Sequence, residues 1–301
     1  MSGVAVWWHG ARPRTLGAGL VPVVVGAAAA GTNGWGWRIP AALVVAAGLQ
    51  IGVNYANDYF DGVRGVDTHE RVGPPRLTQS GAATPRAVLI AALISIGGAA
   101  VAGLALALAT TPALILFVGA LAIGAALLYS GGPRPYAGLG LGELMVFLFF
   151  GLMATCGTTY VIAETITADA WWCGVVMGFL AVAILVANNL RDIPTDEASG
   201  KRTLAVRIGD ARTRTLYRMC VVAGFAAIAI GVLVEMFVGS RYGLDRWALL
   251  GLAAWVYAIR PIEIAGMATG SELIPVLTGT AATHAACGLL VALGLVLARA
   301  G

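Results

Sequence analysis

The chain has 301 residues, of which 59% are hydrophobic and 11% are charged. Soluble domains carry roughly 25% charged residues, so the composition excludes an ordinary soluble protein and indicates a polytopic membrane protein. We therefore expect a lipid bilayer around the chain and no nucleic-acid partner. Only 15 residues are acidic, and Lys201 is the one Lys beside 18 Arg, so the positions of the charges are informative.

The first residues place Trp and Arg ahead of an apolar run, as in a segment that anchors at the membrane interface. Apolar runs then recur along the chain, and most approach the ~20 residues that cross a bilayer. The predicted spans are 16–31, 41–59, 87–110, 113–128, 144–162, 172–190, 217–238, 244–259 and 281–297. We therefore predict an all-α bundle of about nine transmembrane helices.

The basic residues are distributed unevenly about these spans. With the N-terminus in the cytoplasm, four of the 19 basic residues fall outside, namely Arg38, Arg241, Arg246 and Arg299, and the other 15 fall inside. Cytoplasmic loops carry an excess of Lys and Arg. The count predicts a cytoplasmic N-terminus and an external C-terminus.

Two matched groups of acids follow the second and sixth spans. The first is Asn57-Asp58-Tyr59-Phe60-Asp61-Gly62-Val63-Arg64-Gly65-Val66-Asp67, and the second is Asn188-Asn189-Leu190-Arg191-Asp192-Ile193-Pro194-Thr195-Asp196. In both, an Asp lies four residues after the leading Asn, and this spacing places side chains on one face of a helix. Pro194 lies inside the second group and is expected to disturb a continuous helix there.

The matched positions of the groups indicate an internal duplication. Within a single domain covering 1–301, residues 11–135 would pair with 140–270 and leave a ninth helix over. Loops at 60–86 and 191–216 would follow the two groups on the cytoplasmic side, and loops of that length usually carry function.

Neighbouring carboxylates repel one another and stay ionised only where cations hold them. Carboxylate oxygens suit Mg²⁺, which binds a few of them together with substrate phosphate oxygens. One such group is more often a helix cap, but two matched groups on one side favour a shared metal site. The predicted ligands are Asn57, Asp58, Asp61, Asp67, Asn188, Asp192 and Asp196.

If a diphosphate is held between two metal sites, its remaining negative charge would be balanced by nearby basic residues, namely Arg64, Arg191, Lys201 and Arg202. A lipid diphosphate suits this position, because its tail belongs in the bilayer and its head at the interface. Metal-bound diphosphate leaves readily, and departure from an allylic carbon gives a cation that an electron-rich partner must capture with water excluded.

These stretches resemble the UbiA-type superfamily of intramembrane aromatic prenyltransferases over nearly the whole chain. The superfamily pattern is Asn-xxx-Asp-xxx-Asp after helix two and Asp-xxx-Asp after helix six. Here Gly65 replaces the third acid of the first motif and Asp67 is the next acid, a spacing similar to the menaquinone branch. Residues 11–16, 73–81, 140–143 and 200–205 also look like that branch.

The resemblance implies a UbiA-like bundle that transfers a polyprenyl group from its diphosphate to 1,4-dihydroxy-2-naphthoate. Mg²⁺ would be required, CO₂ and diphosphate would be lost, and the product would be demethylmenaquinone. It implies that the catalytic residues are Asp61, Asp67, Asp192, Asp196 and Lys201. Substrate contacts are expected from Arg12, Asn57, Arg64, Tyr136, Asn188 and Arg191, and an aromatic pocket from Tyr136 with Glu143.

Two alternatives remain open at this point. The first is a different aromatic acceptor, such as 4-hydroxybenzoate or a chlorin. A secondary transporter also contains repeats, but it should carry ionisable groups near the membrane midplane. The acids of this chain gather at one interface, which favours the enzyme.

Overall fold

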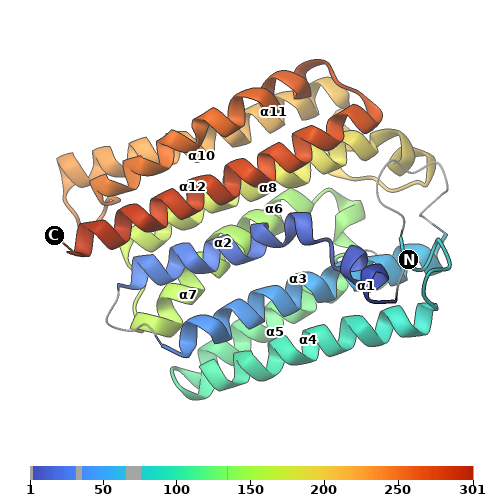
Figure 1. Cartoon of the computed structure of the whole chain (residues 1–301), viewed down its shortest axis with the longest axis horizontal. Helices are drawn as coiled ribbons and strands as arrows, with labels where there is room; N and C mark the ends of the chain where they lie inside the picture. The colour runs from blue at the N-terminus through green and yellow to red at the C-terminus, as the bar shows by residue number, and fades with distance from the viewer. Residues whose placement is uncertain (1–2, 32–35, 66–75, 134, 301) are drawn as a thin grey trace.

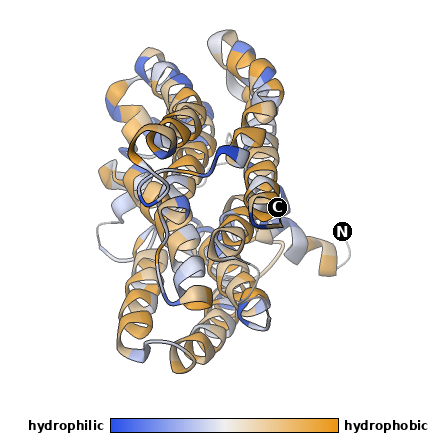
Figure 2. Ribbon diagram, turned by 90° about the vertical axis from the view of Figure 1, so that its left-hand side faces the viewer, coloured by the Kyte–Doolittle hydropathy of each residue, from blue (hydrophilic) through white to orange (hydrophobic). Residues whose placement is uncertain are grey.

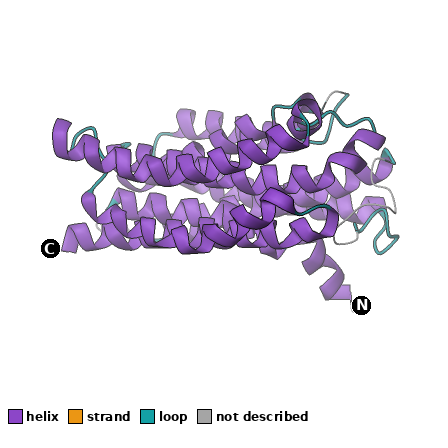
Figure 3. Ribbon diagram, turned by 90° about the horizontal axis from the view of Figure 1, so that it is seen from above, coloured by secondary structure: helices purple, strands orange, loops and turns teal. Residues whose placement is uncertain are grey.

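The computed structural model describes residues 3–31, 36–65, 76–133 and 135–300, and all regular secondary structure in these ranges is helical. Long helices run side by side along one direction (Figure 1), and most loops lie at the two ends of the bundle (Figure 3). Among the described residues, eight helices are long and apolar enough to cross a membrane, and α5 is a shorter apolar helix. The prediction of an all-α membrane protein with about nine spans is confirmed.

The spans follow the predicted order. They are α2 (Pro13–Ala30), α3 (Arg38–Val63), α4 (Pro85–Leu108), α5 (Pro112–Leu128), α6–η3–α7 (Gly142–Val146, Phe147–Met153, Ala154–Ala163), α8 (Ala168–Ala198), α10 (Asp210–Val238), η4–α11 (Arg246–Ala254, Trp255–Met267) and η5–α12 (Gly270–Leu273, Ile274–Ala300). Shorter helices are α1 (Gly3–Ala11), η2 (Tyr136–Leu139) and α9 (Leu204–Ile208).

Local sequence signals set where several spans begin. Pro occupies the first turn of α2, α4 and α5, where its missing N–H costs no helical hydrogen bond. The side chain of Thr84 accepts a hydrogen bond from the amide of Ala87, and that of Thr167 does so from Ala170. These N-caps satisfy donors that the first turn of a helix leaves open.

The end of α8 differs from the prediction. The helix continues through Pro194 to Ala198, so the expected disturbance at Pro194 is wrong. Proline removes one N–H near the end of the helix, and the hydroxyl of Thr195 donates to the carbonyl of Asp192 at 3.0 Å. The predicted loop at 191–216 is also wrong, because α8, α9 and the start of α10 occupy most of that range.

The described residues of both groups of acids lie at one end of the bundle. α3 and α8 end there, close to α1 and the N-terminus, while the C-terminus lies at the opposite end (Figure 1). We call residues 57–65 and 188–203, with the segments around them, the acidic end. The proposed duplication of 11–135 in 140–270 stays a prediction.

The C-terminal half forms the main core. α8 lies at its centre and is buried along most of its length, with Met177 and Leu180 fully enclosed. The largest cluster of buried side chains joins α8 to α2, α10, α11 and α12. Hydrophobic residues predominate along the helices (Figure 2), and many large ones are exposed, which suits contact with lipid. The spans α3 and α4 are less buried than α8, and a cavity lies beside them.

Lipid provides no hydrophobic force to hold helices together, so membrane helices depend on close packing. Glycines permit this packing because they have no side chain to separate the two backbones. Gly151 of η3 lies against Gly174 and Gly178 of α8, and a Cβ at position 151 would lie 2.6 Å from the carbonyl oxygen of Gly174. The contact is with backbone, which cannot rotate away as a side chain does. This contact fixes the fifth span against the core helix.

We predict that Gly151→Ala lowers the melting temperature of the purified protein in detergent, because the added methyl group must push η3 away from α8. Gly157→Ala is the matched control, since a Cβ at position 157 would meet no atom within 4 Å. Thermal unfolding of both variants, followed by circular dichroism, gives the comparison. Equal melting temperatures for the two variants would contradict the proposed packing role.

Candidate active site

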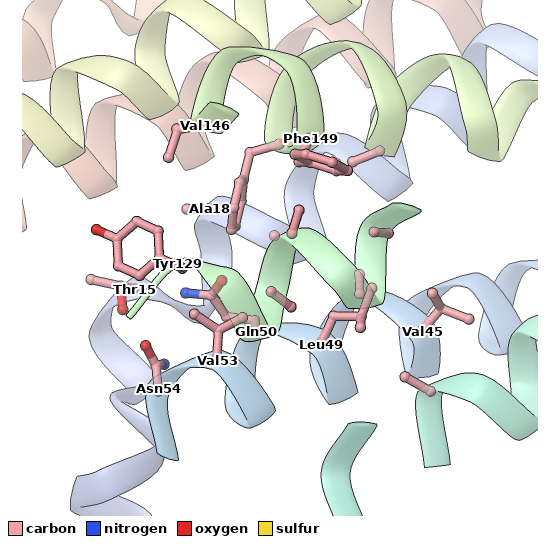
Figure 4. Close-up of a pocket in the computed structure, with 18 of the residues that line it drawn as sticks. Thr15, Ala18, Val45, Leu49, Gln50, Val53, Asn54, Tyr129, Val146 and Phe149 are labelled. Carbon is pink, nitrogen blue, oxygen red and sulfur yellow. The ribbon is translucent and has the colours of Figure 1, made fainter. Parts of the chain in front are cut away.

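A cavity of about 1080 Å³ lies among α2, α3, α4, α5, the fifth span and α8, with further lining residues from α1 and α12. Its walls are apolar over most of their depth, with residues such as Val45, Leu49 and Phe149 (Figure 4). Polar side chains line it mainly toward the acidic end, and they include Arg12, Asn54, Asn57, Asp58, Arg76, Tyr129, Tyr136, Asn188 and Arg191. The cavity therefore offers a polar mouth and a hydrocarbon-like interior.

The last turns of α3 carry the first group of acids. Asn57 is buried, and its Oδ1 has no hydrogen-bond partner among the described residues. Asp61 is also buried, and its Oδ2 lies 3.7 Å from Nζ of Lys201 and 4.0 Å from a guanidinium nitrogen of Arg76. Because Lys201 follows α8, its ion pair with Asp61 brings the two groups of acids together.

Asp58 has a different set of partners. Its two carboxylate oxygens accept hydrogen bonds from the backbone amides of Leu77 and Thr78, at 2.8 and 2.9 Å. These bonds tie the segment after the first group back onto α3 and hold Arg76 beside Asp61. The contacts favour a positioning role for Asp58 over the metal-binding role predicted from its position in the sequence.

The second group forms a compact hydrogen-bonded unit on α8. Arg191 binds the carboxylate of Asp192 through two nitrogens, at 2.7 and 2.8 Å. Asn188 donates to the same carboxylate at 3.2 Å and accepts from Arg191 at 2.8 Å. All three residues were predicted site residues, and Asn188 and Arg191 line the cavity.

Asp196 shapes the turn that follows α8. Its backbone carbonyl accepts a hydrogen bond from the amide of Lys201 at 2.8 Å, and its carboxylate lies 3.4 Å from the hydroxyl of Thr203. The turn therefore folds back over the end of α8. This path carries the side chain of Lys201 across to Asp61 on α3.

Several predicted residues lie outside the cavity lining, namely Asp61, Arg64, Glu143, Asp192, Asp196, Lys201 and Arg202. Arg64 donates to the carbonyl oxygens of Ser130 and Gly132, so it joins the end of α3 to the segment after α5. Glu143 is buried and accepts a hydrogen bond from Asn189 at 3.0 Å. Asp67, predicted as both a metal ligand and a catalytic residue, lies outside the described residues.

Arg12 lies at the junction of α1 and α2. Its backbone adopts the left-handed conformation, with φ of 56°, which is uncommon for a residue other than glycine. The Asn54 side chain donates to the carbonyl of Ala11, and the Tyr55 hydroxyl donates to that of Trp7, so α1 is fixed to α3. The strained junction directs the chain so that Arg12 lines the mouth of the cavity.

Tyr136 lines the cavity as predicted, and its ring packs edge-to-face on Tyr129 with centroids 5.4 Å apart. Burial raises the pKa of Tyr129, and the carboxylates of Glu143, Asp61 and Asp196 raise it further. Burial is likewise the first cause of the raised pKa of Tyr136, followed by Tyr129. Both tyrosines therefore present neutral phenols beside the two groups of acids.

Neither Tyr129 nor Arg76 was predicted from the sequence to be a site residue. Tyr129 ends an apolar run just before Ser130-Gly131-Gly132-Pro133, at the end of the bundle that carries the acids. Arg76 falls in the stretch 73–81, which resembles the menaquinone branch. Residues 73–75 of that stretch lie outside the described part of the chain. Tyr129 could have been identified as a polar residue at the end of a span on the side that carries the acids.

The site combines oxygen donors with cations in a partly enclosed space. Among the described residues, no three His, Cys, Asp or Glu side chains converge as a preformed metal site. The carboxylates of Asp61 and Asp192 instead lie on different helices, and each is paired with a cation. An anionic ligand with its own metal ions is the chemistry that this arrangement can accommodate.

Comparisons with known proteins agree with this geometry. Residues 19–263 match the UbiA prenyltransferase family. The chain is 48% identical to 1,4-dihydroxy-2-naphthoate octaprenyltransferase of Mycobacterium tuberculosis, over 93% of each chain. It is 46% identical to the enzyme of the same name from Mycobacterium leprae, over 99% of this chain and 98% of that one.

The fold is also similar to that of a solved structure. A UbiA homolog from Archaeoglobus fulgidus, determined bound to DMAPP and Mg²⁺, matches with a TM-score of 0.62 and 16% sequence identity. The match covers 95% of this chain and 98% of that chain. At this level of identity the similarity concerns the arrangement of helices.

Proposed function

This chain belongs to the UbiA prenyltransferase family, and we propose that it transfers a polyprenyl group from polyprenyl diphosphate to 1,4-dihydroxy-2-naphthoate. The products are demethylmenaquinone in its reduced form, CO₂ and diphosphate. The observation that carries this function is the division of one cavity into a charged mouth and an apolar interior. A lipid diphosphate has the same division, and a soluble substrate does not.

Mg²⁺ is the metal that fits the donor set. Carboxylate and amide oxygens are hard ligands, and Asn57 carries a buried Oδ1 without a partner among the described residues. Asn57 and Asp61 would hold one ion, and Asn188, Asp192 and Asp196 another, with Asp67 as a further predicted ligand. Bound there, Mg²⁺ would neutralise the diphosphate and stabilise charge on its leaving oxygen.

The cations of the site have a second task. Lys201, Arg76 and Arg191 already lie beside Asp61 and Asp192, so positive charge is paired with these buried carboxylates. When a diphosphate enters, the same side chains are close enough to bind its oxygens. Arg12 reaches the cavity from the α1–α2 junction and is positioned to bind an anionic group there as well.

The reaction itself needs alignment more than proton transfer. The allylic carbon–oxygen bond breaks, and the pair of electrons leaves with the diphosphate. The carboxyl-bearing ring carbon, made electron-rich by ring hydroxyl substitution, forms the new bond to the allylic carbon. Loss of CO₂ then returns the electrons of the carbon–carboxylate bond to the ring. The apolar walls keep water from the cation while the two carbons meet.

The decarboxylation provides the direct test of this function. Purified protein supplied with Mg²⁺, a polyprenyl diphosphate and carboxyl-¹⁴C-labelled 1,4-dihydroxy-2-naphthoate should release one labelled CO₂ for each prenyl group transferred. A prenylated product that retains the label would refute the proposed chemistry. A preference for 4-hydroxybenzoate in a parallel assay would instead point to a different acceptor.

We predict that Asp61→Asn and Asp192→Asn each lower turnover by at least about a hundredfold, the size of effect seen when one preorganised electrostatic group is removed. Both changes remove a negative charge that a divalent cation requires. Asp210→Asn is the matched control, since Asp210 is an exposed acid in an i,i+4 pair with Arg214. Mg²⁺ with diphosphate should raise the melting temperature of the wild type and of Asp210→Asn more than that of the other two variants. Near-normal turnover in both test variants would rule out the two-sided metal site.

The chain is a multi-pass membrane protein. We propose that it lies in a bacterial plasma membrane with its acidic end on the cytoplasmic side. The excess of basic residues at that end supports this orientation. Ser80 and Ser240 are exposed at opposite ends of the bundle, and the four native cysteines are buried. Ser80→Cys and Ser240→Cys are therefore matched reporters with a low background.

An impermeant maleimide added to intact cells, or to spheroplasts of a bacterium with an outer membrane, should label Ser240→Cys. It should label Ser80→Cys only after the membrane is permeabilised. The reverse pattern would invert the topology and place the acidic end outside.

A further inference from the structure

One polar side chain in the cavity has no role in the function proposed above. Gln50 lies on α3, and it shares a cavity-lining face with Asn54 and Asn57, four and seven residues further on. The amide of Asn54 is used, because it donates to the carbonyl of Ala11. The Oε1 of Gln50 is buried and has no hydrogen-bond partner among the described residues.

The surroundings of Gln50 are apolar. Leu49 and Val53 flank it on α3, and Figure 4 shows its amide projecting into the cavity near Tyr129, with Phe149 entering from the fifth span. A Cβ built on Gly19 of α2 would lie 3.8 Å from both Cβ of Gln50 and Cε1 of Phe150. Three walls of the cavity therefore come together at the level of this amide.

An amide oxygen without a donor is unfavourable in such a place, because it has lost water and gained nothing in exchange. A ligand that supplies a donor would remove this penalty. The polyprenyl chain is a hydrocarbon and has no donor to offer. The acceptor of the proposed reaction does, since it carries ring hydroxyls.

The depth of Gln50 also matches the acceptor. Gln50 precedes Asn57 by seven residues, so at 1.5 Å per residue it lies about 10 Å further into the bundle than the proposed diphosphate site. The acceptor ring must meet the allylic carbon at about 3–3.5 Å, just beyond the diphosphate. A fused ring extending inward from that point reaches the level of Gln50, with the rings of Tyr129 and Phe149 nearby.

We propose that Gln50 is an acceptor-specificity residue whose Oε1 accepts a hydrogen bond from the 4-hydroxyl of 1,4-dihydroxy-2-naphthoate. This inference rests on the proposed function. The 1-hydroxyl is adjacent to the carboxylate and donates to it within the molecule. The 4-hydroxyl has no such internal partner and needs an acceptor from the protein. A site that binds a substrate hydroxyl in this way discriminates against an analogue that lacks it.

The test compares two acceptors in wild type, Gln50→Met and Gln50→Asn. The second acceptor, 1-hydroxy-2-naphthoate, lacks only the 4-hydroxyl and keeps the activating hydroxyl beside the reacting carbon. Methionine matches the length of glutamine without an amide, and asparagine retains a shorter amide. Gln79→Met makes the same replacement at a position that does not line the cavity.

We expect wild type to prefer the dihydroxy acceptor in kcat/KM, and Gln50→Met to lose about tenfold of that preference, equivalent to about 1.4 kcal/mol. The loss should appear mainly as a higher KM for 1,4-dihydroxy-2-naphthoate, with KM for polyprenyl diphosphate unchanged. Gln50→Asn should retain part of the preference. Gln79→Met should show the wild-type ratio between the two acceptors.

Equal losses on both acceptors in Gln50→Met would overturn the assignment, because the amide would then not detect the 4-hydroxyl. A change confined to KM for polyprenyl diphosphate would overturn it too and would place Gln50 against the prenyl chain. Failure of the proposed function looks different, since wild type itself would then transfer to neither naphthoate. If Gln50→Met does not fold, the ratio of kcat/KM for the two acceptors in Gln50→Asn is the deciding measurement. A ratio equal to that of wild type would then count against the contact.

Discussion

Carboxylates persist inside a membrane protein only where cations hold them, and this constraint organises the acidic end. Asp61 on α3 and Asp192 on α8 are both buried, and Lys201 and Arg191 lie beside them. Since Lys201 follows α8 yet pairs with Asp61, the neutralisation of one helix end depends on the other. The ends of α3 and α8 are therefore bound together, and the mouth of the cavity lies where they meet.

The spans of the bundle differ in how much of their length is buried. α8 packs against α10, α11 and α12 in a dense core, which gives the second group of acids a fixed support. α3 and α4 line the cavity together with α2, α5, the fifth span and α8, and they are less buried than α8. Preorganised charge requires a support that does not relax, whereas a long hydrocarbon substrate requires space. The core around α8 provides the support, and the cavity provides the space.

The sequence predicted the spans, the all-α class and the placement of both acid groups at one end, because hydropathy and charge distribution act over whole helices. It was wrong at Pro194, since the packing of α8 outweighs one lost hydrogen bond. It could not reveal the Lys201–Asp61 pair, which depends on the path of a short turn. Tyr129 and Gln50 could not be predicted, because a single polar residue in or at the end of an apolar run has no spacing to mark it. The approach of Arg76 to Asp61 depends on the backbone hydrogen bonds of Leu77 and Thr78 to Asp58. The roles of the acids themselves stay predictions.

The π-helical geometry of η3 has a consequence for how this protein tolerates change in chain length. A π-turn holds one more residue than an α-turn, and each residue of an α-helix turns the chain by about 100°. Deleting one residue within Phe147–Met153 would allow the segment to become regular α-helix with its flanking turns still in register, but it would remove the local geometry that presents Phe149 to the cavity and Gly151 to α8. Related proteins should therefore conserve the number of residues in this span more strictly than their identities. An insertion or deletion there would mark a cavity of altered shape, even where every acidic motif is intact.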